Sequence, residues 1–327
     1  MKYELLISSR VAGKTFIPAV IDPVEWTTER KSTPGKLTFS VIKDETLSFH
    51  EGDAVRFKVN DEKVFFGFVF VKKRDREKII KVTAYDQLRY LKNKDTYVYE
   101  NKTASQLIKM LADDFRLQAG DLTDTKFVIA SRVEDNTSLF DMIGNALDLT
   151  LQNTKELYVL YDDFGKITLK NLADMKVGSD DEGYLMIDAE TAENFDYSSS
   201  IDNDTYNKIK LCFENSETGK RDIYIAQDSE HMNWWGVLQY FDTLSKSENG
   251  KTKADSLLQL YNHVSRNLKI NNAFGDTRVR AGSMIIVNLK LGDMDMKNFM
   301  LVERCVHRFS LDEHTMTLTV RGGDFVA

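Results

Sequence analysis

One pattern of apolar residues occurs twice in this chain, first after Gly52 and again after Gly282. In each copy the glycine is followed by three segments in which apolar residues alternate with other residues. Side chains on a β-strand point alternately to opposite faces, so each copy predicts three antiparallel strands entered through a glycine turn. The residues that define the first copy are Val55, Phe57, Val59, Phe66-Gly67-Phe68-Val69, Ile80, Val82 and Ala84, and those of the second are Ile285, Val287, Leu289, Phe299-Met300-Leu301-Val302, Met316, Leu318 and Val320.

Recurrence of the whole order is a stronger signal than any single strand. It predicts two related small β-domains, one near each end of the chain. Closed or nearly closed barrels hide the strand edges that otherwise template aggregation, and we expect that solution here. The predicted fold is α+β but mainly β, with two similar small antiparallel β-barrels, residues 1–95 and 199–327, flanking a mixed α/β domain of residues 96–198.

Composition narrows the class of protein. A chain of 327 residues with 42% hydrophobic and 29% charged residues has room for two or three ordinary globular domains. Its net charge of −7 argues against a protein that grips nucleic-acid phosphates, so no specific nucleic-acid binding is expected. We find neither a signal sequence nor an apolar run long enough for a bilayer, which predicts synthesis in the bacterial cytoplasm and no membrane partner. Two cysteines are too few for a disulfide framework.

The middle of the chain predicts two helices and a hairpin. Thr103 and Gln106 have the spacing of a capping box, in which the two side chains satisfy each other's free backbone N–H groups. A second helix is expected from about Ser138. A hairpin is expected across the Asp162-Asp163-Phe164-Gly165 turn. The apolar stripes of the two helices are Leu107, Met110, Leu111 and Phe115, then Leu139, Met142, Ile143, Ala146 and Leu147.

The last third of the chain returns to β-type alternation. A hairpin formed by 206–213 and 221–226 is expected to precede the second repeat as 26–42 precedes the first. Between this hairpin and the repeat, residues near 251–268 predict an amphipathic helix inserted into the second barrel. Its apolar face comprises Ala254, Leu257, Leu258, Tyr261, Val264 and Leu268.

A search for reactive chemistry finds no strong motif. The sequence lacks a glycine-rich phosphate loop, a G-x-S-x-G elbow and an H-E-x-x-H pair. Cys305 and His307 would share one face of a strand, with His314 close by, but a structural metal site needs four ligands, and an ordinary outward-facing or packed pair is the favoured interpretation. Asp202-x-Asp204 lacks the glycine and distal glutamate of a calcium loop. We therefore expect no catalytic residue, no metal and no cofactor.

The densest aromatic cluster surrounds Trp234 and Trp235, followed by Tyr240. The favoured interpretation is a structural plug at one end of a barrel. The alternative is a partner interface, because Trp and Tyr dominate interface hot spots.

Six short blocks, taken in order, resemble the baseplate hub proteins of contractile phage tails, of defective prophages and of tail-like bacteriocins. More distantly, the chain is similar to the N-terminal part of type VI secretion spike proteins. The likeness covers essentially the whole chain. The blocks are Phe66-Gly67-Phe68-Val69, Tyr85-Asp86-Gln87-Leu88-Arg89-Tyr90-Leu91, Asn101-Lys102-Thr103-Ala104, Tyr206-Asn207-Lys208-Ile209, Trp235-Gly236-Val237-Leu238-Gln239-Tyr240 and Gly275-Asp276-Thr277-Arg278-Val279-Arg280-Ala281-Gly282-Ser283.

The resemblance implies a structural, non-enzymatic protein in the tail of a phage or phage tail-like particle. It implies a homotrimer that joins the inner tail tube protein to the central spike protein and contacts other baseplate proteins. Three subunits with two similar barrels each would present six barrels, which reconciles a threefold spike with a sixfold tube. Two alternatives stay open: a peptidoglycan hydrolase, which needs two carboxylates in a cleft, and a wall-sugar-binding tail protein that uses Trp234 and Trp235.

Overall fold

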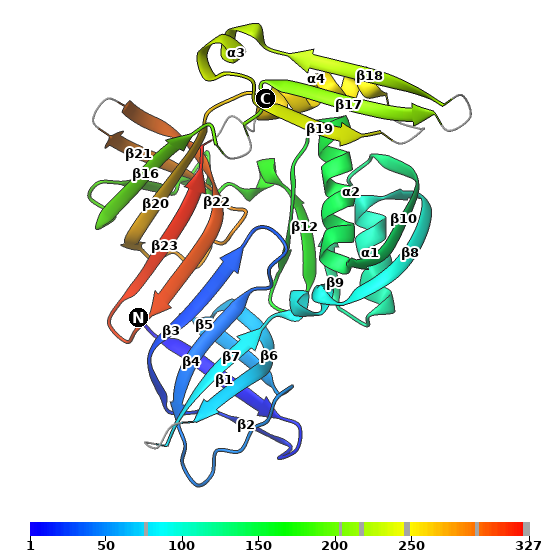
Figure 1. Cartoon of the computed structure of the whole chain (residues 1–327). Coiled ribbons are helices and arrows are strands. Elements are labelled where there is room, and N and C mark those ends of the chain that lie inside the picture. Colours follow the sequence, from blue (N-terminus) through cyan, green and yellow to red (C-terminus); the bar gives the residue numbers. More distant parts are fainter. Residues whose placement is uncertain (75–77, 203–204, 216–218, 245–248, 292–293, 323–327) are drawn as a thin grey trace. The chain divides into compact units, whose positions relative to one another are not determined.

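The computed structural model describes residues 1–74, 78–202, 205–215, 219–244, 249–291 and 294–322 (Figure 1). Strand makes up 53% and helix 19%, so the prediction of a mainly β, largely antiparallel protein is confirmed. The chain divides into two compact units. The first comprises Met1–Asp196 and Lys269–Val320, and the second comprises Tyr197–Leu268 and the segment from Arg321. Within the described residues, none of the helices has the length and apolarity needed to cross a membrane.

The first repeat lies in an antiparallel module with the neighbour order β3-β4-β7-β6-β5-β1, and β2 pairs beyond β1. Its buried residues alternate along the strands as predicted: Val55, Phe57 and Val59 face the core on β5, and Ile80, Val82 and Ala84 on β7. The strands are β1 (Tyr3–Ser9), β2 (Lys14–Phe16), β3 (Val20–Glu29), β4 (Lys36–Ile42), β5 (Ala54–Val59), β6 (Glu62–Arg74) and β7 (Ile79–Tyr85).

The second repeat lies in a module with the neighbour order β16-β20-β23-β22-β21-β15. If the six strands of each module are ranked in chain order, both modules read 2-3-6-5-4-1. The modules differ at one end, where β1 pairs antiparallel to β5 but β15 pairs parallel to β21. The strands are β15 (Met186–Asp188), β16 (Asn194–Ser200), β20 (Ser265–Phe274), β21 (Met284–Leu291), β22 (Met294–Phe309) and β23 (His314–Arg321).

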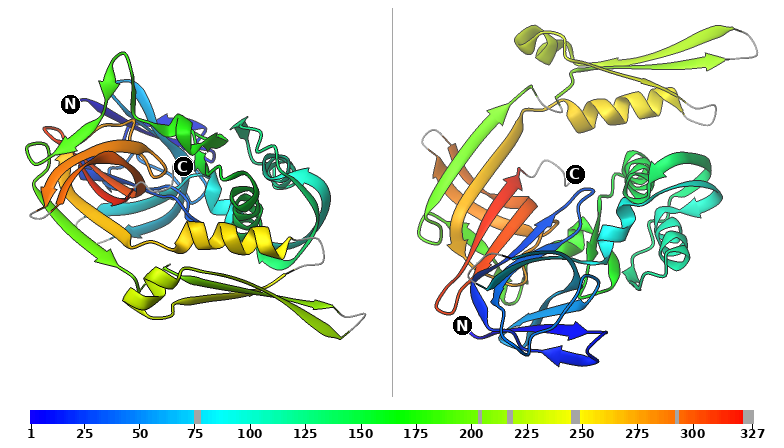
Figure 2. Two further views of the ribbon diagram at one scale, coloured as in Figure 1. Left: turned by 90° about the horizontal axis from the view of Figure 1, so that it is seen from above. Right: turned by 60° about the horizontal axis from the view of Figure 1, so that its bottom comes forward.

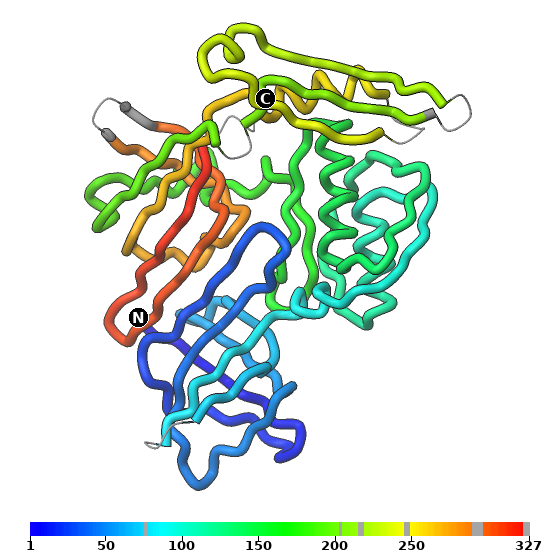
Figure 3. Tube along the Cα trace, in the orientation of Figure 1, coloured from blue at the N-terminus to red at the C-terminus, as the bar shows by residue number. Residues whose placement is uncertain are grey.

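The two predicted closed barrels are not confirmed. Among the described residues, β1 does not pair with β3, and β15 does not pair with β16. Instead, β22 of the second module pairs antiparallel with β3 of the first, from Arg304↔Glu29 to Phe309↔Val24 (Figure 3). The result is one 13-stranded sheet. Each module therefore covers one edge of the other, while among the described residues β2, β15 and β16 remain edge strands of the sheet.

The glycine turns of the two repeats make the same hydrogen bonds. Gly52 N donates to Val69 O and Gly282 N to Val302 O, both at 2.7 Å. Val69 N returns a bond to Asp53 O, and Val302 N to Ser283 O, both at 2.9 Å. Both glycines have positive φ, +86° and +94°. The same backbone device therefore joins the start of β5 to β6 and the start of β21 to β22.

The middle of the chain forms two helices against short strands, and its predicted local features are confirmed. Thr103 and Gln106 make the capping box, with N···O distances of 3.0 and 3.3 Å. The second helix begins after Ser138, and a hairpin spans the Asp162 turn. The elements are η1 (Gln87–Lys92), β8 (Lys94–Thr103), α1 (Ala104–Asp114), β9 (Ala119–Leu122), β10 (Val128–Ser138), α2 (Leu139–Thr154), β11 (Tyr158–Asp162), β12 (Ile167–Asn171), η2 (Leu172–Met175), β13 (Gly178–Ser179) and β14 (Gly183–Tyr184).

The insertion before the second repeat is larger than a single helix. A three-stranded sheet, ordered β18-β17-β19, and helices α3 and α4 lie between β16 and β20 in the chain. The predicted 206–213 and 221–226 hairpin belongs to this sheet and does not correspond to β3–β4. Its elements are β17 (Lys208–Asn215), β18 (Lys220–Gln227), α3 (Ser229–Trp235), β19 (Gln239–Thr243) and α4 (Gly250–Tyr261).

The helix predicted near 251–268 was placed too far along the chain at its C-terminal end. Helix α4 ends at Tyr261, and Leu268 lies buried in β20. The physical reason is that Leu268 and Ile270 are buried with the exposed Lys269 between them, so these residues extend a strand of the large sheet. Leu268 satisfies either a helical or an alternating pattern, and pairing with neighbouring strands decides between them.

The surroundings of Gly52 and Gly282 predict that substitution by alanine destabilises the protein to different extents. Both Gly52→Ala and Gly282→Ala strain a positive φ, which costs about 1 kcal/mol. A Cβ on Gly52 would meet open space, whereas one on Gly282 would lie 2.3 Å from Val159 Cγ1. Overpacking adds roughly 1–3 kcal/mol, so Gly282→Ala should destabilise more in urea unfolding. Val159→Ala should relieve part of the Gly282→Ala loss and none of the Gly52→Ala loss. Equal losses for the two glycine variants would contradict this account.

Candidate functional site

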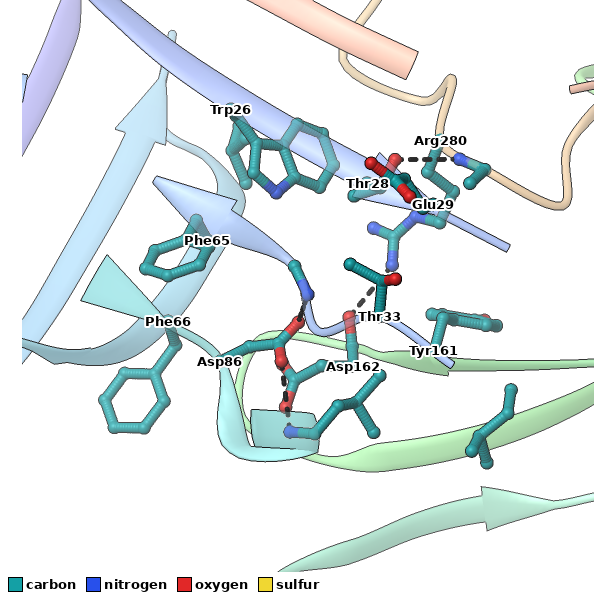
Figure 4. A pocket seen from close by; sticks show the side chains of 15 residues that line it. Trp26, Thr28, Glu29, Thr33, Phe65, Phe66, Asp86, Tyr161, Asp162 and Arg280 are labelled. Atoms are coloured by element: carbon teal, nitrogen blue, oxygen red, sulfur yellow. Dashed lines mark hydrogen bonds between the residues drawn. The ribbon is translucent and has the colours of Figure 1, made fainter. Parts of the chain in front are cut away.

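The candidate site is a buried polar junction in the first unit, where three distant segments meet (Figure 4). Asp86 follows β7 of the first module, Asp162 ends β11 of the middle segment, and Arg280 precedes β21 of the second module. These residues line one cavity together with Trp26 and Tyr161. The junction therefore connects both modules to the middle segment.

Asp86 ties the end of β7 to the turn before β4. Its Oδ2 accepts a hydrogen bond from Gly35 N at 2.8 Å, and its Oδ1 accepts one from Leu88 N at 3.0 Å. A Cβ on residue 35 would lie 2.3 Å from Oδ2, so glycine is required for this close approach. Burial, and secondarily the charge of Asp162, raises the pKa of Asp86 well above its usual range.

Asp162 lies opposite Asp86, and Figure 4 shows the two carboxyl groups pointing toward each other. Burial raises the pKa of Asp162 to about 6, against hydrogen bonds that lower it, including one from Gly165 N at 2.6 Å. Its Oδ2 is buried without a hydrogen-bond partner in the described part of the chain. Two carboxyls that face each other in a buried site favour sharing a proton over ionising together.

Arg280 supplies the cation of the junction. Its Nη1 donates to the backbone oxygen of Asp162 at 3.0 Å. The guanidinium lies over two aromatic rings, 4.7 Å from the centroid of Tyr161 and 5.6 Å from that of Trp26. Cation–π contact and a hydrogen bond together fix a planar, permanently charged group in a way that lysine could not. One side chain from the second module thus contacts both other segments.

Further contacts hold the same three parts together. Arg30 and Glu303 form a bidentate ion pair with N···O distances of 2.8 and 2.9 Å, and Ala281 N donates to Thr28 Oγ1 at 2.9 Å. Equivalent phenylalanines of the two repeats both face the middle segment. Phe66 lies 5.9 Å from Phe164, and Phe299 lies 5.1 Å from Tyr184, measured between ring centroids. Each module therefore docks the middle segment through the same position of its repeat.

The junction is too small to be a catalytic cleft. Its cavity of about 20 Å³ holds roughly one water molecule. A pair of carboxyls with raised pKa is what a glycoside hydrolase requires, but a sugar ring could not reach this pair. A larger open groove of about 590 Å³ lies elsewhere in the first unit. Two of its carboxylates already accept bonds within the chain: Asp22 from Leu311 N at 2.9 Å and Glu193 from Asn272.

Cys305, His307 and His314 come together in the core, but as a hydrogen-bonded chain. His307 Nε2 lies 2.8 Å from Val279 O and 3.0 Å from Cys305 Sγ, and His307 Nδ1 lies 2.9 Å from His314 Nε2. Burial lowers the pKa of His307 to about 3 and that of His314 to about 4. Both nitrogens of His307 are engaged, and the described residues contain no cluster suited to a metal ion.

The aromatic candidates lie in the second unit and have different environments. Trp234, in α3, is 65% exposed. Trp235 stacks on His231 with centroids 4.0 Å apart. Tyr240 packs with Tyr206 and Tyr261 against the core formed by the sheet and α4. Of the three residues, Trp234 alone is exposed enough to meet a partner directly.

Sequence reasoning did not identify Asp86, Asp162 and Arg280 as members of one site. Asp86 and Arg280 stand inside blocks that carry the family resemblance, and Asp162 opens a turn. Each has an ordinary local explanation, and their proximity depends on how three distant segments pack. A signal was available in the sequence: an acidic residue follows the third strand of the first repeat, and an arginine precedes the glycine of the second.

The raised pKa of Asp162 predicts how stability depends on pH. Because its folded-state pKa of about 6 exceeds the ordinary 3.8, the stabilising protonated form is fully present below about pH 4 and is lost as pH rises through 6. Relative to Asp162→Asn, wild type should lose roughly 2–3 kcal/mol of unfolding free energy between pH 4 and 7. The lowered pKa values of His307 and His314 make stability depend on pH in the opposite sense. The quantity to measure is therefore the difference in unfolding free energy between wild type and Asp162→Asn.

Urea unfolding of both proteins at several pH values checks this, with Asp163→Asn, at an exposed neighbour, as the control. The asparagine amide should donate to Asp86, so Asp162→Asn should be at least as stable as wild type at pH 7. A difference that does not change with pH would contradict the protonated pair.

Comparison with known proteins agrees with the fold. A family model described as YQBQ-like matches residues 24–321. Two Bacillus subtilis (strain 168) proteins align over 314 residues, which are 93% of each chain: YqbQ at 32% identity, and XkdQ of the phage-like element PBSX at 31%.

Solved structures share the fold at low sequence identity. The 43 kDa tail protein of prophage MuSo2 from Shewanella oneidensis has a TM-score of 0.70 at 13% identity, over 99% of this chain and 100% of that one. Prophage tail protein gp18 from Listeria monocytogenes EGD-e has a TM-score of 0.64 at 10% identity, over 99% and 95%. The E. coli protein c3393, a type VI secretion component, has a TM-score of 0.59 at 10% identity, over 99% and 78%.

These findings confirm the resemblance to prophage tail proteins and, more distantly, to type VI secretion proteins. The structural neighbours are phage tail and baseplate-type proteins. With a family model spanning nearly the whole chain and two relatives above 30% identity, the chain belongs to the YQBQ-like family.

Proposed function

We propose that this chain is the structural hub of a contractile-tail baseplate, a homotrimeric adaptor that joins a sixfold inner tail tube to a threefold central spike. The observation that carries the proposal is the internal duplication. Two modules of one chain share the strand order 2-3-6-5-4-1 and the same hydrogen bonds at their glycine turns. A threefold assembly of such a chain presents six similar modules, which lets it match sixfold and threefold neighbours.

The differences between the modules support the same role. The first module ends in the antiparallel pair β1–β5 with β2 beyond it, whereas the second ends in the short parallel strand β15. Gly52 faces open space, and Gly282 faces Val159. Alternate modules around a threefold ring meet different neighbours, so their shared cores and distinct edges fit a pseudo-sixfold arrangement.

The relatives support the proposed location and partners. XkdQ belongs to a phage-like element, and the neighbours from Shewanella oneidensis and Listeria monocytogenes are prophage tail proteins. The neighbour c3393 has structural similarity to the T4 tail proteins gp27 and gp5. We infer that the chain works in the tail of a phage or tail-like particle, with the tube protein, the spike protein and other baseplate proteins as partners.

The proposed role requires no catalysis. The one buried carboxyl pair described above is enclosed with room for about one water molecule, and it connects segments that must keep their relative positions. We therefore assign the pair to holding the two modules on the middle segment. The proposed mechanism of the hub is geometric: each chain presents two similar modules to its neighbours.

The proposal predicts a particle of three times the 37.6 kDa subunit mass in light scattering at micromolar concentration. Negative-stain micrographs of the same sample should show a ring with a central hole and six lobes around its rim. Addition of the tube and spike proteins should give a stable complex that contains three copies of this chain. A mass equal to one subunit that persists with both proteins present would overturn the proposal.

A further inference from the structure

The second unit has an apolar sheet face that nothing in its own structure covers. Helix α4 packs on one face of the β17–β18–β19 sheet, where Ile209, Leu211 and Ala226 meet Ala254 and Leu257 (Figure 2). The opposite face carries the residues between these along each strand. The strand register aligns Ile225 and Phe241 with Lys210, and Ile223 with Cys212, across adjacent strands.

The large apolar residues of this second face are more than half exposed. Ile223 is 53%, Ile225 54% and Phe241 57% exposed. A single exposed hydrophobic residue needs no explanation, but three in adjacent rows of one sheet face, two of them on the same strand, indicate an interaction surface. We call this set, with Lys208 and Lys210 of the central strand, the lysine face.

Charge indicates what kind of surface fits the lysine face. Lys210 projects from the central strand between Ile225 and Phe241 of the two outer strands, and Lys208 lies in the next row, between two glutamines. A partner that buries the isoleucines and the phenylalanine must supply carboxylates to the lysines, because a desolvated charge without a partner is costly. The partner surface should therefore combine exposed aliphatic residues with acidic ones.

The chain itself carries such a surface on the β8–β10 sheet. Val98 and Val133 are cross-strand partners, 63% and 65% exposed, on the face opposite the helix-covered core. Glu100 and Ser131 form the next row, with Lys102 beyond Glu100 on the same side of β8, and on the other side of the valines Asp135 accepts a hydrogen bond from Thr96 Oγ1 at 2.9 Å. This set, the acidic face, offers two valines between two carboxylates.

We propose that the lysine face of one copy docks on the acidic face of the next copy. The two faces are different surfaces of one chain, so the contact is head-to-tail, and a head-to-tail contact closes into a ring when its rotation permits. The contact buries apolar area on both sides and pairs Lys210 with Glu100. This inference rests on the proposed homotrimer and names the contact that would hold it.

Ile225→Glu tests the lysine face. A carboxylate there would lie against Val98, Val133 and the acidic residues, so the subunit concentration at half-dissociation of the trimer should rise at least tenfold. Ile17→Glu is the control, since Ile17 is 78% exposed and lies outside both faces. Unchanged thermal unfolding of each variant shows that it folds. The measurement is light scattering over a dilution series.

Charge reversal tests whether the acidic face of a second copy docks on the lysine face. Lys210→Glu and Glu100→Lys should each weaken the trimer, and the double variant should recover most of the wild-type mass. A monomeric wild type would overturn the trimer itself. A trimeric wild type that Ile225→Glu leaves intact would overturn the lysine face while the hub proposal stands. Dissociation by Ile225→Glu without recovery in the double reversal would overturn the acidic face as the partner.

Discussion

The pairing of β22 with β3 is the interaction on which the rest of the first unit depends. Strand β22 pairs with β21 of its own module from Met294 to Leu301, and then with β3 of the other module from Arg304 to Phe309. A shared strand makes the two modules continuous through backbone hydrogen bonds, which do not depend on particular side chains. Hinge motion between the modules would break this ladder, so their relative positions are fixed by main-chain structure.

The polar junction adds side-chain contacts to the backbone pairing of β22 with β3. Arg280 brings one positive charge to a site with two carboxyls, and burial penalises every ionised form. Apolar side chains in place of these polar groups would cost less free energy at neutral pH. The polar groups therefore contribute more to the specificity of the docking geometry than to stability. Gly35 and Leu88 bind one carboxyl, Gly165 binds the other, and Arg280 reaches the backbone of Asp162. Each bond has a fixed direction, which specifies how the middle segment sits on both modules.

The sequence was informative for most local features, although helical periodicity misplaced the end of α4, and it was uninformative where distant segments meet. The alternation after Gly52 and Gly282, the Thr103 capping box and the hairpin at Asp162 are local, and the structure contains them. Closure of the barrels was expected because an unpaired edge is a hazard, but β3 is instead covered by pairing with β22 of the other module, which no local pattern predicts. The Asp86–Asp162 pair depends on packing of three segments, and no spacing along the chain encodes it.

Because the two copies of the repeat lie in one chain, their surroundings can differ while both keep the same hydrogen-bonded glycine turn. The turn needs a residue that tolerates positive φ and a backbone carbonyl on the next strand that accepts its N–H. Both copies supply these. What surrounds the turn is free to differ: Gly52 borders open space, whereas Gly282 is covered by Val159 of the middle segment. A pair of separate, identical subunits could not make this distinction without changing both copies. In a fused pair each module can change its own surroundings, because each position mutates independently.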